Sequence, residues 1–400
     1  MRLKISLLLF AFVALCAFTT HAQKSKAQLE KERKENLKRI SETQKILEQT
    51  ATEKKSTLGQ LKAINHQITI RQDLIKSINQ EISMINGEIN DLTIVTVALE
   101  SDLDQLKKEY AEMIYSAYKT NHGYSQLTFI FSASTFNQLF LRLKYLEQYA
   151  NARERQVQQI EKVKDALNSQ KSSLVSKKEE QSKLLESKIE ENKNLIGLQS
   201  KQSKIIQDLS KREKELKREL ANRKRSIEQL DQLLAEIIKK EIRDSNKGKE
   251  ANTIALSAEG AVLSASFEDN KNKLPWPVAS GFVSEKFGKH PHPVLKNITV
   301  ENQGVDIQTQ KDASVKPVFA GKVATTAFVP GMNSVVIVQH GDYYTLYAKL
   351  KTVNVKKGQT ISPNQSLGTV YTNKDGISEL QFQVWKNNVK LDPEKWLSSK

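Results

Sequence analysis

Mostly apolar residues recur at alternating steps of three and four along a part of the chain that contains no proline. This spacing puts them on one face of an α-helix, and its persistence over many repeats is typical of a coiled coil. The first such seam consists of Leu61, Ile64, Ile68, Arg71, Ile75, Ile78, Ile82, Ile85, Ile89, Leu92, Thr96, Leu99, Leu103, Leu106, Tyr110 and Met113.

A second, less regular seam follows it, and Lys and Glu fill most of the positions between its members. Between the two seams, residues 120–123 break the helical pattern, and residues 132–135 offer an N-cap for the next helix. We expect an antiparallel α-helical coiled-coil hairpin over residues 23–245, with its tip near 119–145. The second seam consists of Val157, Ile160, Leu167, Leu174, Leu195, Leu198, Ile205, Leu209, Leu216, Leu220, Ile227, Leu230, Leu234 and Ile237.

The pattern changes to a period of two near the C-terminus, and all eight prolines lie at or after Pro275. β-branched and aromatic residues alternate there with polar ones between Gly-containing turns, which is typical of strands. We expect an all-β domain over 275–400, joined to the hairpin by a linker over 246–274. The clearest strands are expected at 335–339, 343–347 and 380–385.

The N-terminus begins with two cations and a short apolar run and then has small residues, which is typical of a secretory signal peptide. We expect this signal peptide to cover residues 1–22. The only cysteine, Cys16, lies inside it, so the exported chain would have neither a disulfide nor a cysteine nucleophile. A lipoprotein is the less favoured alternative, because Leu15 precedes that cysteine where a small residue is usual.

The chain is basic, with a formal net charge of +16, and removal of Arg2 and Lys4 with the signal peptide lowers it by two. Export argues against nucleic acid as a partner. Anionic phospholipid, anionic wall polymers or an acidic protein would fit the charge better. The alternative is that the long helices are simply covered by solvated lysines.

Three runs near the C-terminus resemble, in order and spacing, the LytM or M23 family of peptidoglycan endopeptidases. They read NQGVDI at 302–307, LYAKL at 346–350 and ELQFQV at 379–384, where the family has HxGxD, YxHL and HLHFE. In that family the first His, the Asp and the last His hold zinc, and the other two His assist the bound water. The resemblance assigns the ligand positions to Asn302, Asp306 and Gln381, and the assisting positions to Lys349 and Glu379.

This set of residues is a poor one for catalytic zinc, which needs about three nitrogen, sulfur or carboxylate ligands and an open position for water. Amides are weak ligands, and Lys349 adds a cation where the family has a neutral imidazole. We therefore predict no catalytic residue, no metal, no other cofactor and no enzymatic activity. The alternative is a weak two-carboxylate site between Asp306 and Glu379. The emptied groove, lined by Asn302, Asp306, Lys349, Glu379 and Gln381, is expected to bind a partner protein.

The other histidines of this region, His290, His292 and His340, lie beside prolines or at a probable hairpin. We expect them to have structural roles, because a lone His is more often a satisfied polar residue than a ligand.

Apolar and aromatic residues gather at the expected tip of the hairpin, more densely than a seam alone requires. The run QLFLRLKYL at 138–146 resembles the coiled-coil region of EnvC-type and PcsB-type cell-separation proteins. The resemblance implies that this tip docks on an FtsEX-like division ABC transporter. A small satellite core that closes the hairpin is the equally weighted alternative. The predicted docking residues are Phe129, Phe131, Phe136, Leu139, Phe140 and Leu143.

The linker is richer in apolar residues than a plain linker needs to be. These residues could form one face of a short helix, weakened by Gly260. We expect this segment to be regulatory, folding back over the groove, so that deletion of 251–270 would raise partner binding. Its apolar residues are Ile254, Leu256, Val262, Leu263 and Phe267.

Together these features resemble an EnvC-type murein hydrolase activator, a coiled coil followed by a degenerate LytM domain. The resemblance implies a non-catalytic activator of an N-acetylmuramoyl-L-alanine amidase in cell separation, located in the periplasm or cell envelope at the inner membrane. Three alternatives stay open: an active zinc endopeptidase, a periplasmic adaptor of a transport assembly, and a protein that anchors passively to peptidoglycan.

Overall fold

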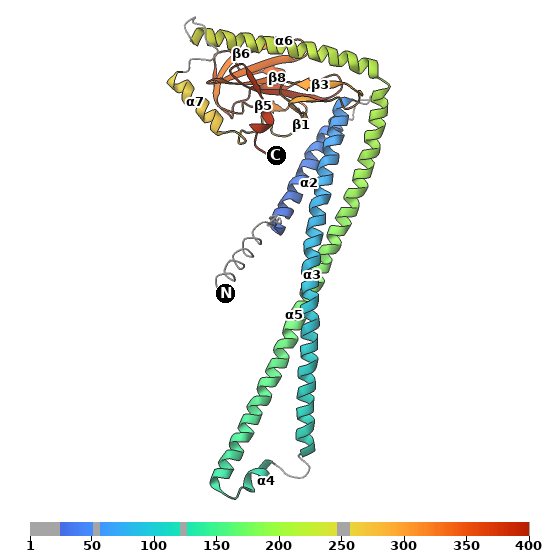
Figure 1. Cartoon of the computed structure of the whole chain (residues 1–400), viewed down its shortest axis with the longest axis vertical. Coiled ribbons are helices and arrows are strands. Elements are labelled where there is room, and N and C mark those ends of the chain that lie inside the picture. Colours follow the sequence, from blue (N-terminus) through green and yellow to red (C-terminus); the bar gives the residue numbers. More distant parts are fainter. Residues whose placement is uncertain (1–24, 51–56, 121–125, 246–256, 400) are drawn as a thin grey trace, which may run out of the picture. The chain divides into compact units, whose positions relative to one another are not determined.

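The computed structural model of the chain describes residues 25–50, 57–120, 126–245 and 257–399 (Figure 1). These residues form two compact units. One comprises the described part of Met1–Glu32 together with Ile75–Glu190, and the other comprises Arg33–Leu74 and Glu191–Lys400. The predicted signal peptide lies outside the described residues.

The predicted helices are confirmed, with bounds α2 (Lys26–Thr50), α3 (Leu58–Thr120), α4 (Gln126–Phe131), α5 (Phe136–Ser210), α6 (Glu213–Ser245) and α7 (Ala258–Asp269). Every residue of the first predicted seam is buried or half-buried along α3. Within the described ranges, no helix combines the length and the apolar character that crossing a bilayer would need.

In the first unit, α3 and α5 are linked by ion pairs between residues whose order is reversed along the two helices. Lys177 lies 2.5 Å from Glu88, and Lys171 lies 2.6 Å from Glu100. The predicted cap of α5 is also present, because the Thr135 hydroxyl accepts a hydrogen bond from the backbone N–H of Gln138 at 3.2 Å. The two helices therefore run antiparallel, as the hairpin prediction requires.

The second unit contains the predicted β-domain, with strands β1 (Phe282–Glu285), β2 (Gly288–Pro291), β3 (Thr299–Asn302), β4 (Val305–Thr309), β5 (Ser314–Val315), β6 (Gly321–Val329), β7 (Asn333–His340), β8 (Tyr343–Val353), β9 (Thr360–Ile361), β10 (Gly368–Val370), β11 (Ser378–Lys386) and β12 (Val389–Leu391). A short 3₁₀ helix covers Pro393–Lys395. The main sheet has the order β1-β4-β11-β8-β7-β6-β9, and β2 pairs with β3 separately. Its strands pair antiparallel.

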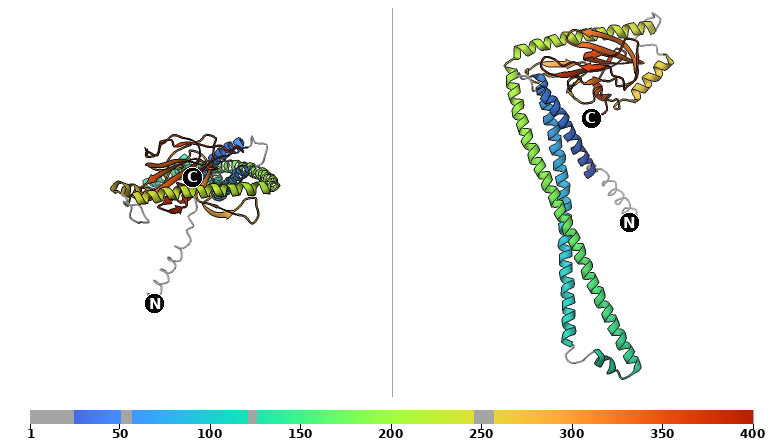
Figure 2. Two further views of the ribbon diagram at one scale, coloured as in Figure 1. Left: turned by 90° about the horizontal axis from the view of Figure 1, so that it is seen from above. Right: turned by 180° about the vertical axis from the view of Figure 1, so that it is seen from behind.

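Helix α6 lies along the β-domain (Figure 2), and the C-terminal part of its apolar seam packs on this sheet. Leu230, Leu234 and Ile238 are almost fully buried there, against a surface that includes Tyr344 and Trp385. The seam predicted for this part of the chain is therefore real, but α6 belongs with the β-domain. The break between α5 and α6 at residues 211–212 was not predicted.

Helix α7 belongs to the β-domain as well, which corrects the prediction that its segment folds over the groove. Phe267 is fully buried in the main core, with its ring stacked 4.9 Å from the ring of His340, whereas Val262 is exposed and Leu263 half-buried. Ile254 and Leu256 lie outside the described residues. Deletion of 251–270 would remove a core residue, so it is not a clean test of regulation.

Candidate functional site

Strand register brings together the groove residues that the sequence motifs predicted. Asp306 on β4 lies opposite Gln381 of β11 on one side and opposite Glu285 of β1 on the other. Side chains two residues apart on a strand share a face, so Glu379 lies on the same face of β11 as Gln381. Residues from distant motifs therefore meet at one place on the sheet.

The two amides at the expected zinc-ligand positions bond to each other. The Gln381 Nε2 donates to Asn302 Oδ1 at 2.9 Å, and the same oxygen accepts the Gly304 N–H at 3.2 Å. The Asn302 Nδ2 donates to the Glu285 carbonyl at 3.3 Å. Both amides are fully buried. Their mutual hydrogen bond links β3 to β11 inside the domain. The Asn302 oxygen that a metal would need already accepts two hydrogen bonds.

Lys349 reaches two carboxylates of the groove from a distorted point of β8. Its φ is +64°, an uncommon conformation for a residue with a side chain, and the backbone there is fixed by a 2.7 Å hydrogen bond from its N–H to the Met332 carbonyl. The Lys349 ammonium donates to Asp306 Oδ1 at 3.1 Å and to Glu379 Oε2 at 2.6 Å. A cation therefore bridges the two carboxylates.

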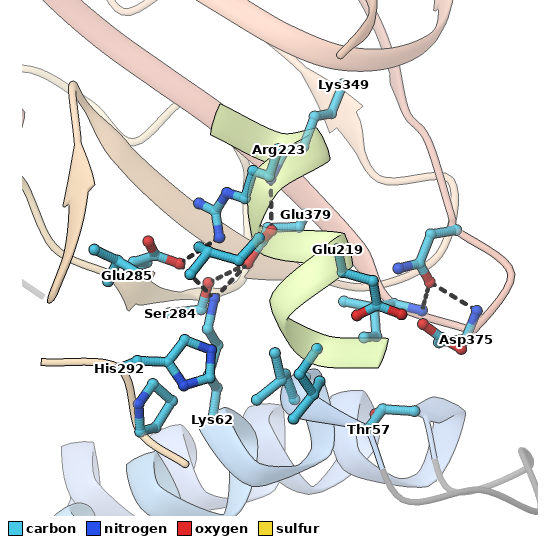
Figure 3. Close-up of a pocket in the computed structure, with 18 of the residues that line it drawn as sticks. Thr57, Lys62, Glu219, Arg223, Ser284, Glu285, His292, Lys349, Asp375 and Glu379 are labelled. Atoms are coloured by element: carbon cyan, nitrogen blue, oxygen red, sulfur yellow. Dashed lines mark hydrogen bonds and ion pairs between the residues drawn. The ribbon is translucent and has the colours of Figure 1, made fainter. Parts of the chain in front are cut away.

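Two further cations, Arg223 and Lys62, enter the groove from helices (Figure 3). The sequence motifs predicted neither of them. The Arg223 guanidinium of α6 donates to Glu285 Oε2 at 2.7 Å and also pairs with Asp306. The Lys62 ammonium of α3 lies 3.0 Å from Glu285 Oε2 and 3.4 Å from Glu379 Oε1. The carboxylates of the groove are thus paired with cations of the chain itself.

The shifts in pKa follow from this cluster of charges. Burial opposes ionisation of Glu285, but Lys62 and Arg223 outweigh it and lower the pKa of this carboxyl to about 2. Burial likewise opposes ionisation of Glu379, and Lys349 and Lys62 outweigh it to hold its pKa well below the usual value. Burial alone would lower the pKa of Arg223 and of Lys62, yet the neighbouring carboxylates raise both. Asp306 differs, because burial and the Glu379 charge raise its pKa.

These residues do not fit the catalytic zinc that the motif positions hold in the resembled family. Asp306 is the one carboxylate at the expected ligand positions, and both of its oxygens are already paired with cations, Lys349 and Arg223. A dication there would lie against two positive charges and would have to displace them.

The charged cluster lines part of an open cavity of about 740 Å³ that lies between α3, α6 and the β-domain. His290 and His292 line it, with Glu219 of α6 and Asp375 of the β10–β11 loop on the opposite side of the close-up in Figure 3. Burial and the Asp375 charge raise the pKa of Glu219.

The three histidines make hydrogen bonds or ion contacts within the domain. His292 Nδ1 accepts the backbone N–H of Leu295 at 3.0 Å, and His290 Nε2 lies 3.5 Å from Glu285. His340 is fully buried, with hydrogen-bond partners at both ring nitrogens.

The predicted docking residues of the hairpin tip lie at α4 and the start of α5. Phe131 and Phe136 are strongly exposed, at 76% and 84%, and the Arg142 guanidinium lies 4.9 Å from the centre of the Phe129 ring. Leu139 is half-buried, and Phe140 and Leu143 are exposed. Docking of this tip on a transporter, and its alternative of a small core that closes the hairpin, both stay predictions.

Comparison with known proteins finds the model of Peptidase family M23 at residues 300–393. The chain is 29% identical over 132 residues to the cell division protein DipM of Caulobacter vibrioides. The aligned region covers 32% of this chain and 20% of DipM. The chain is also 29% identical over 134 residues to the peptidoglycan DD-endopeptidase ShyA of Vibrio cholerae, which covers 32% of this chain and 30% of ShyA.

Among solved structures, a zinc-containing peptidase from Vibrio cholerae is 27% identical, with a TM-score of 0.28, and covers 32% of this chain and 40% of that one. The chain thus spans less than a third of the length of DipM or ShyA. The C-terminal β-domain of this chain is an M23 peptidase domain, the LytM type that its motifs resemble.

Proposed function

We propose that this chain is a non-catalytic activator of peptidoglycan amidases, of the N-acetylmuramoyl-L-alanine amidase class, in cell-wall remodelling and daughter-cell separation. The observation that carries the proposal is the M23 site itself, where amides replace ligands and lysine and arginine pair with the remaining carboxylates. The names of two relatives, a cell division protein and a peptidoglycan endopeptidase, support a role at the cell wall.

Activation would work by differential binding. A ligand shifts an equilibrium between two states only by its preference for one of them. The groove must therefore bind an inhibitory element of the amidase and so favour the open, active state of the amidase. In this chain Arg223 and Lys62 already form ion pairs with a carboxylate of the groove, Glu285. The amidase element therefore competes with α6 and α3, and the closed chain is the resting state.

Release of the groove would be coupled to the helical hairpin. We place the chain outside the cytoplasm, in the periplasm or cell envelope and peripheral to the inner membrane. There the exposed aromatic tip would dock on an FtsEX-like division ABC transporter. Movement of the transporter would then be transmitted along α5 to α6. Direct contact with peptidoglycan is an additional possibility for the opened groove.

The test mixes the purified chain with an amidase and dye-labelled cell wall and measures dye release. We expect the chain to stimulate the amidase and to release no dye alone, with or without added zinc. Lys349→Glu should abolish stimulation, because it places a third carboxylate beside Asp306 and Glu379. Lys351→Glu is the matched control, because Lys351 lies two residues along β8 and pairs with the exposed Asp312.

Thermal unfolding of both variants shows whether the domain stays folded. Full stimulation by a folded Lys349→Glu variant would reject the role of the groove. Release of dye by the chain alone, abolished by a chelator, would establish the zinc endopeptidase instead.

A further inference from the structure

The middle of α3 has a charge opposite to that of the chain as a whole (Figure 1). The chain has 62 Lys and Arg against 46 Asp and Glu, yet α3 has no basic residue between Lys76 and Lys107. The acidic residues of this stretch are Glu81, Glu88, Asp91, Glu100, Asp102 and Asp104. An acidic section of helix therefore lies within a basic chain.

The outward face of the same section is uncharged. Ile94 lies two residues from both Leu92 and Thr96 of the hairpin seam, so it points about 200° away from them around the helix. Steps of three and four from Ile94 give a second row on this outward face, and every member of it is exposed. This row, the outer seam, consists of Ser83, Gly87, Asn90, Ile94, Val97 and Ser101.

Apolar side chains are exposed in the outer seam and beside it. Ile94 is 61% exposed, Val97 is 59% exposed, and the adjacent Val95 is 43% exposed. These β-branched residues have a lower helix propensity than Lys, Glu or Gln, so they do not stabilise α3 as an isolated helix. Single exposed apolar residues are ordinary, but a contiguous apolar group on a highly charged helix is typical of an interaction site.

Exposed carboxylates border these apolar residues. Asp91 lies four residues before Val95 and Asp102 lies seven residues after it, so the three follow one row beside the outer seam. Both aspartates are exposed, whereas Glu88 and Glu100 pair with lysines of α5. A segment that fits this face therefore has apolar residues and, next to them, positive charge.

The same charges disfavour two other occupants of this face. An anionic phospholipid surface would be repelled by Asp91 and Asp102. A second copy of the chain, joined through the same face, would bring the acidic rows of both copies to one interface, and like charges placed together there oppose association. A cationic helix of another protein has neither disadvantage.

We propose that the outer seam binds an amphipathic α-helix of a partner protein, with apolar residues at steps of three and four and basic residues beside them. At about 1.5 Å per residue, the seam from Ser83 to Ser101 spans about five turns. Gly87 and the two serines have small side chains, which let another helix approach closely. The site includes no residue of the groove or of the hairpin tip, so the proposal does not rest on amidase activation.

The test measures binding of a synthetic, fluorescein-labelled peptide to the full chain by fluorescence anisotropy. The peptide has roughly three heptads, with Leu or Ile at the first and fourth positions, Lys at the fifth and seventh, and Gln or Ala elsewhere. Ile94→Ser with Val97→Ser should weaken its binding at least about tenfold, because these side chains form the centre of the contact. Ile189→Ser is the matched control, since Ile189 is 69% exposed on α5 of the same unit, and it should leave binding unchanged.

Charge reversal separates this site from general attraction between peptide and chain. Asp91→Lys with Asp102→Lys should weaken binding at least about tenfold, and less so at high salt, where exposed charges are screened. Asp165→Lys with Glu186→Lys changes the net charge equally at exposed positions of α5 and should leave binding unchanged. A peptide with Glu in place of every Lys should bind the unaltered chain at least about tenfold more weakly than the Lys peptide.

Absence of binding, equal binding of the Lys and Glu peptides, or equal effects of the site and control substitutions would overturn the proposal. So would a dimer of the unaltered chain in sedimentation equilibrium that Ile94→Ser with Val97→Ser dissociates, because a second copy would then cover the face. Flotation with phosphatidylglycerol vesicles that the same variant loses would assign the face to a membrane instead. If circular dichroism shows that the Ser variant loses helix, Ile94→Ala with Val97→Ala replaces it, since Ala has the highest helix propensity.

Discussion

At the scale of single residues, His340 shows how burial sets a charge state. Its Nδ1 lies 2.6 Å from the Ala320 carbonyl, which can only accept, so Nδ1 carries the proton. Its Nε2 lies 2.8 Å from the Thr345 hydroxyl oxygen. Burial lowers the pKa of His340 to about 4. The ring is therefore neutral across the physiological range.

This lowered pKa predicts a pH dependence of folding. The unfolded histidine binds a proton below its usual pKa of 6.5 and the folded one does not, so stability is fully present above that pH and falls as the pH falls toward 4. The loss from His340 should reach about 3 kcal/mol by pH 4. Urea unfolding followed by tryptophan fluorescence reports on the β-domain, because all three tryptophans lie in it.

The matched control is His340→Gln, which has no titrating ring at this position. Carboxylates titrate in both proteins, so the informative quantity is the difference between the two stability curves. That difference should narrow as the pH falls from 6.5 to 4. Parallel curves would show that His340 does not carry the effect.

Single residues also show what the sequence could and could not predict about the groove. The resemblance to the M23 motifs placed Asn302, Asp306 and Gln381 in one site, and the pairing of β4 with β11 brings Asp306 and Gln381 opposite each other. The motifs gave no sign of Lys62, whose partners lie far away in the sequence and meet it only through tertiary packing. For Arg223 a sign was present, since it lies seven residues after Leu216 and seven before Leu230. An arginine at an apolar seam position predicts a buried anionic partner.

At the scale of elements, α6 has two parts with different chemistry. Its N-terminal part brings Arg223 to the groove, whereas its C-terminal part lies on the sheet through Leu230, Leu234 and Ile238. Between these two parts, Ser226 lies against the β6–β7 turn, because a Cβ added to Gly331 would collide with the Ser226 hydroxyl. Under the proposed function, the apolar part anchors the helix on the sheet while the charged part leaves the groove.

The anchor can be tested by truncating it. Leu234→Ala should lower the free energy of unfolding of the second unit by about 2–5 kcal/mol, because a fully buried leucine leaves a cavity. It should also expose α6 to limited proteolysis. Ile196→Ala is the matched control, since Ile196 is 66% exposed on α5 and its truncation should change stability by less than about 0.5 kcal/mol. Equal effects of the two substitutions would show that α6 is not anchored by its apolar face.

Element type was more predictable than element partner. The steps of three and four in α3, α5 and α6 correctly indicated helices, and the alternation in β7, β8 and β11 correctly indicated strands. Periodicity defines which face of a helix is apolar but not what covers it. The C-terminal part of the α6 seam therefore suggested a second helix where the structure has a sheet, and the apolar residues of α7 suggested a lid where Phe267 fills the core.

At the scale of the whole molecule, the charge pairs of the groove define a closed state whose population sets activity under the proposed function. Breaking a buried ion pair by removing one partner costs about 3–5 kcal/mol. A substitution that removes Arg223 therefore shifts the population toward the open state by a large factor, whereas the anchor on the sheet is unchanged. The chain would then activate its partner without a signal from the hairpin.

Arg223→Glu in the full chain should raise amidase stimulation, measured without any transporter, by about tenfold or more at chain concentrations well below saturation. Arg225→Glu changes the net charge equally at an exposed position of the same helix and should leave stimulation unchanged. Stimulation by the Arg223 variant should saturate at the level reached by the unaltered chain at high concentration, because opening changes the fraction of competent molecules and not the complex they form. A higher plateau would instead mean that Arg223 acts on the amidase after binding, and an unchanged dose curve would mean that α6 does not compete for the groove.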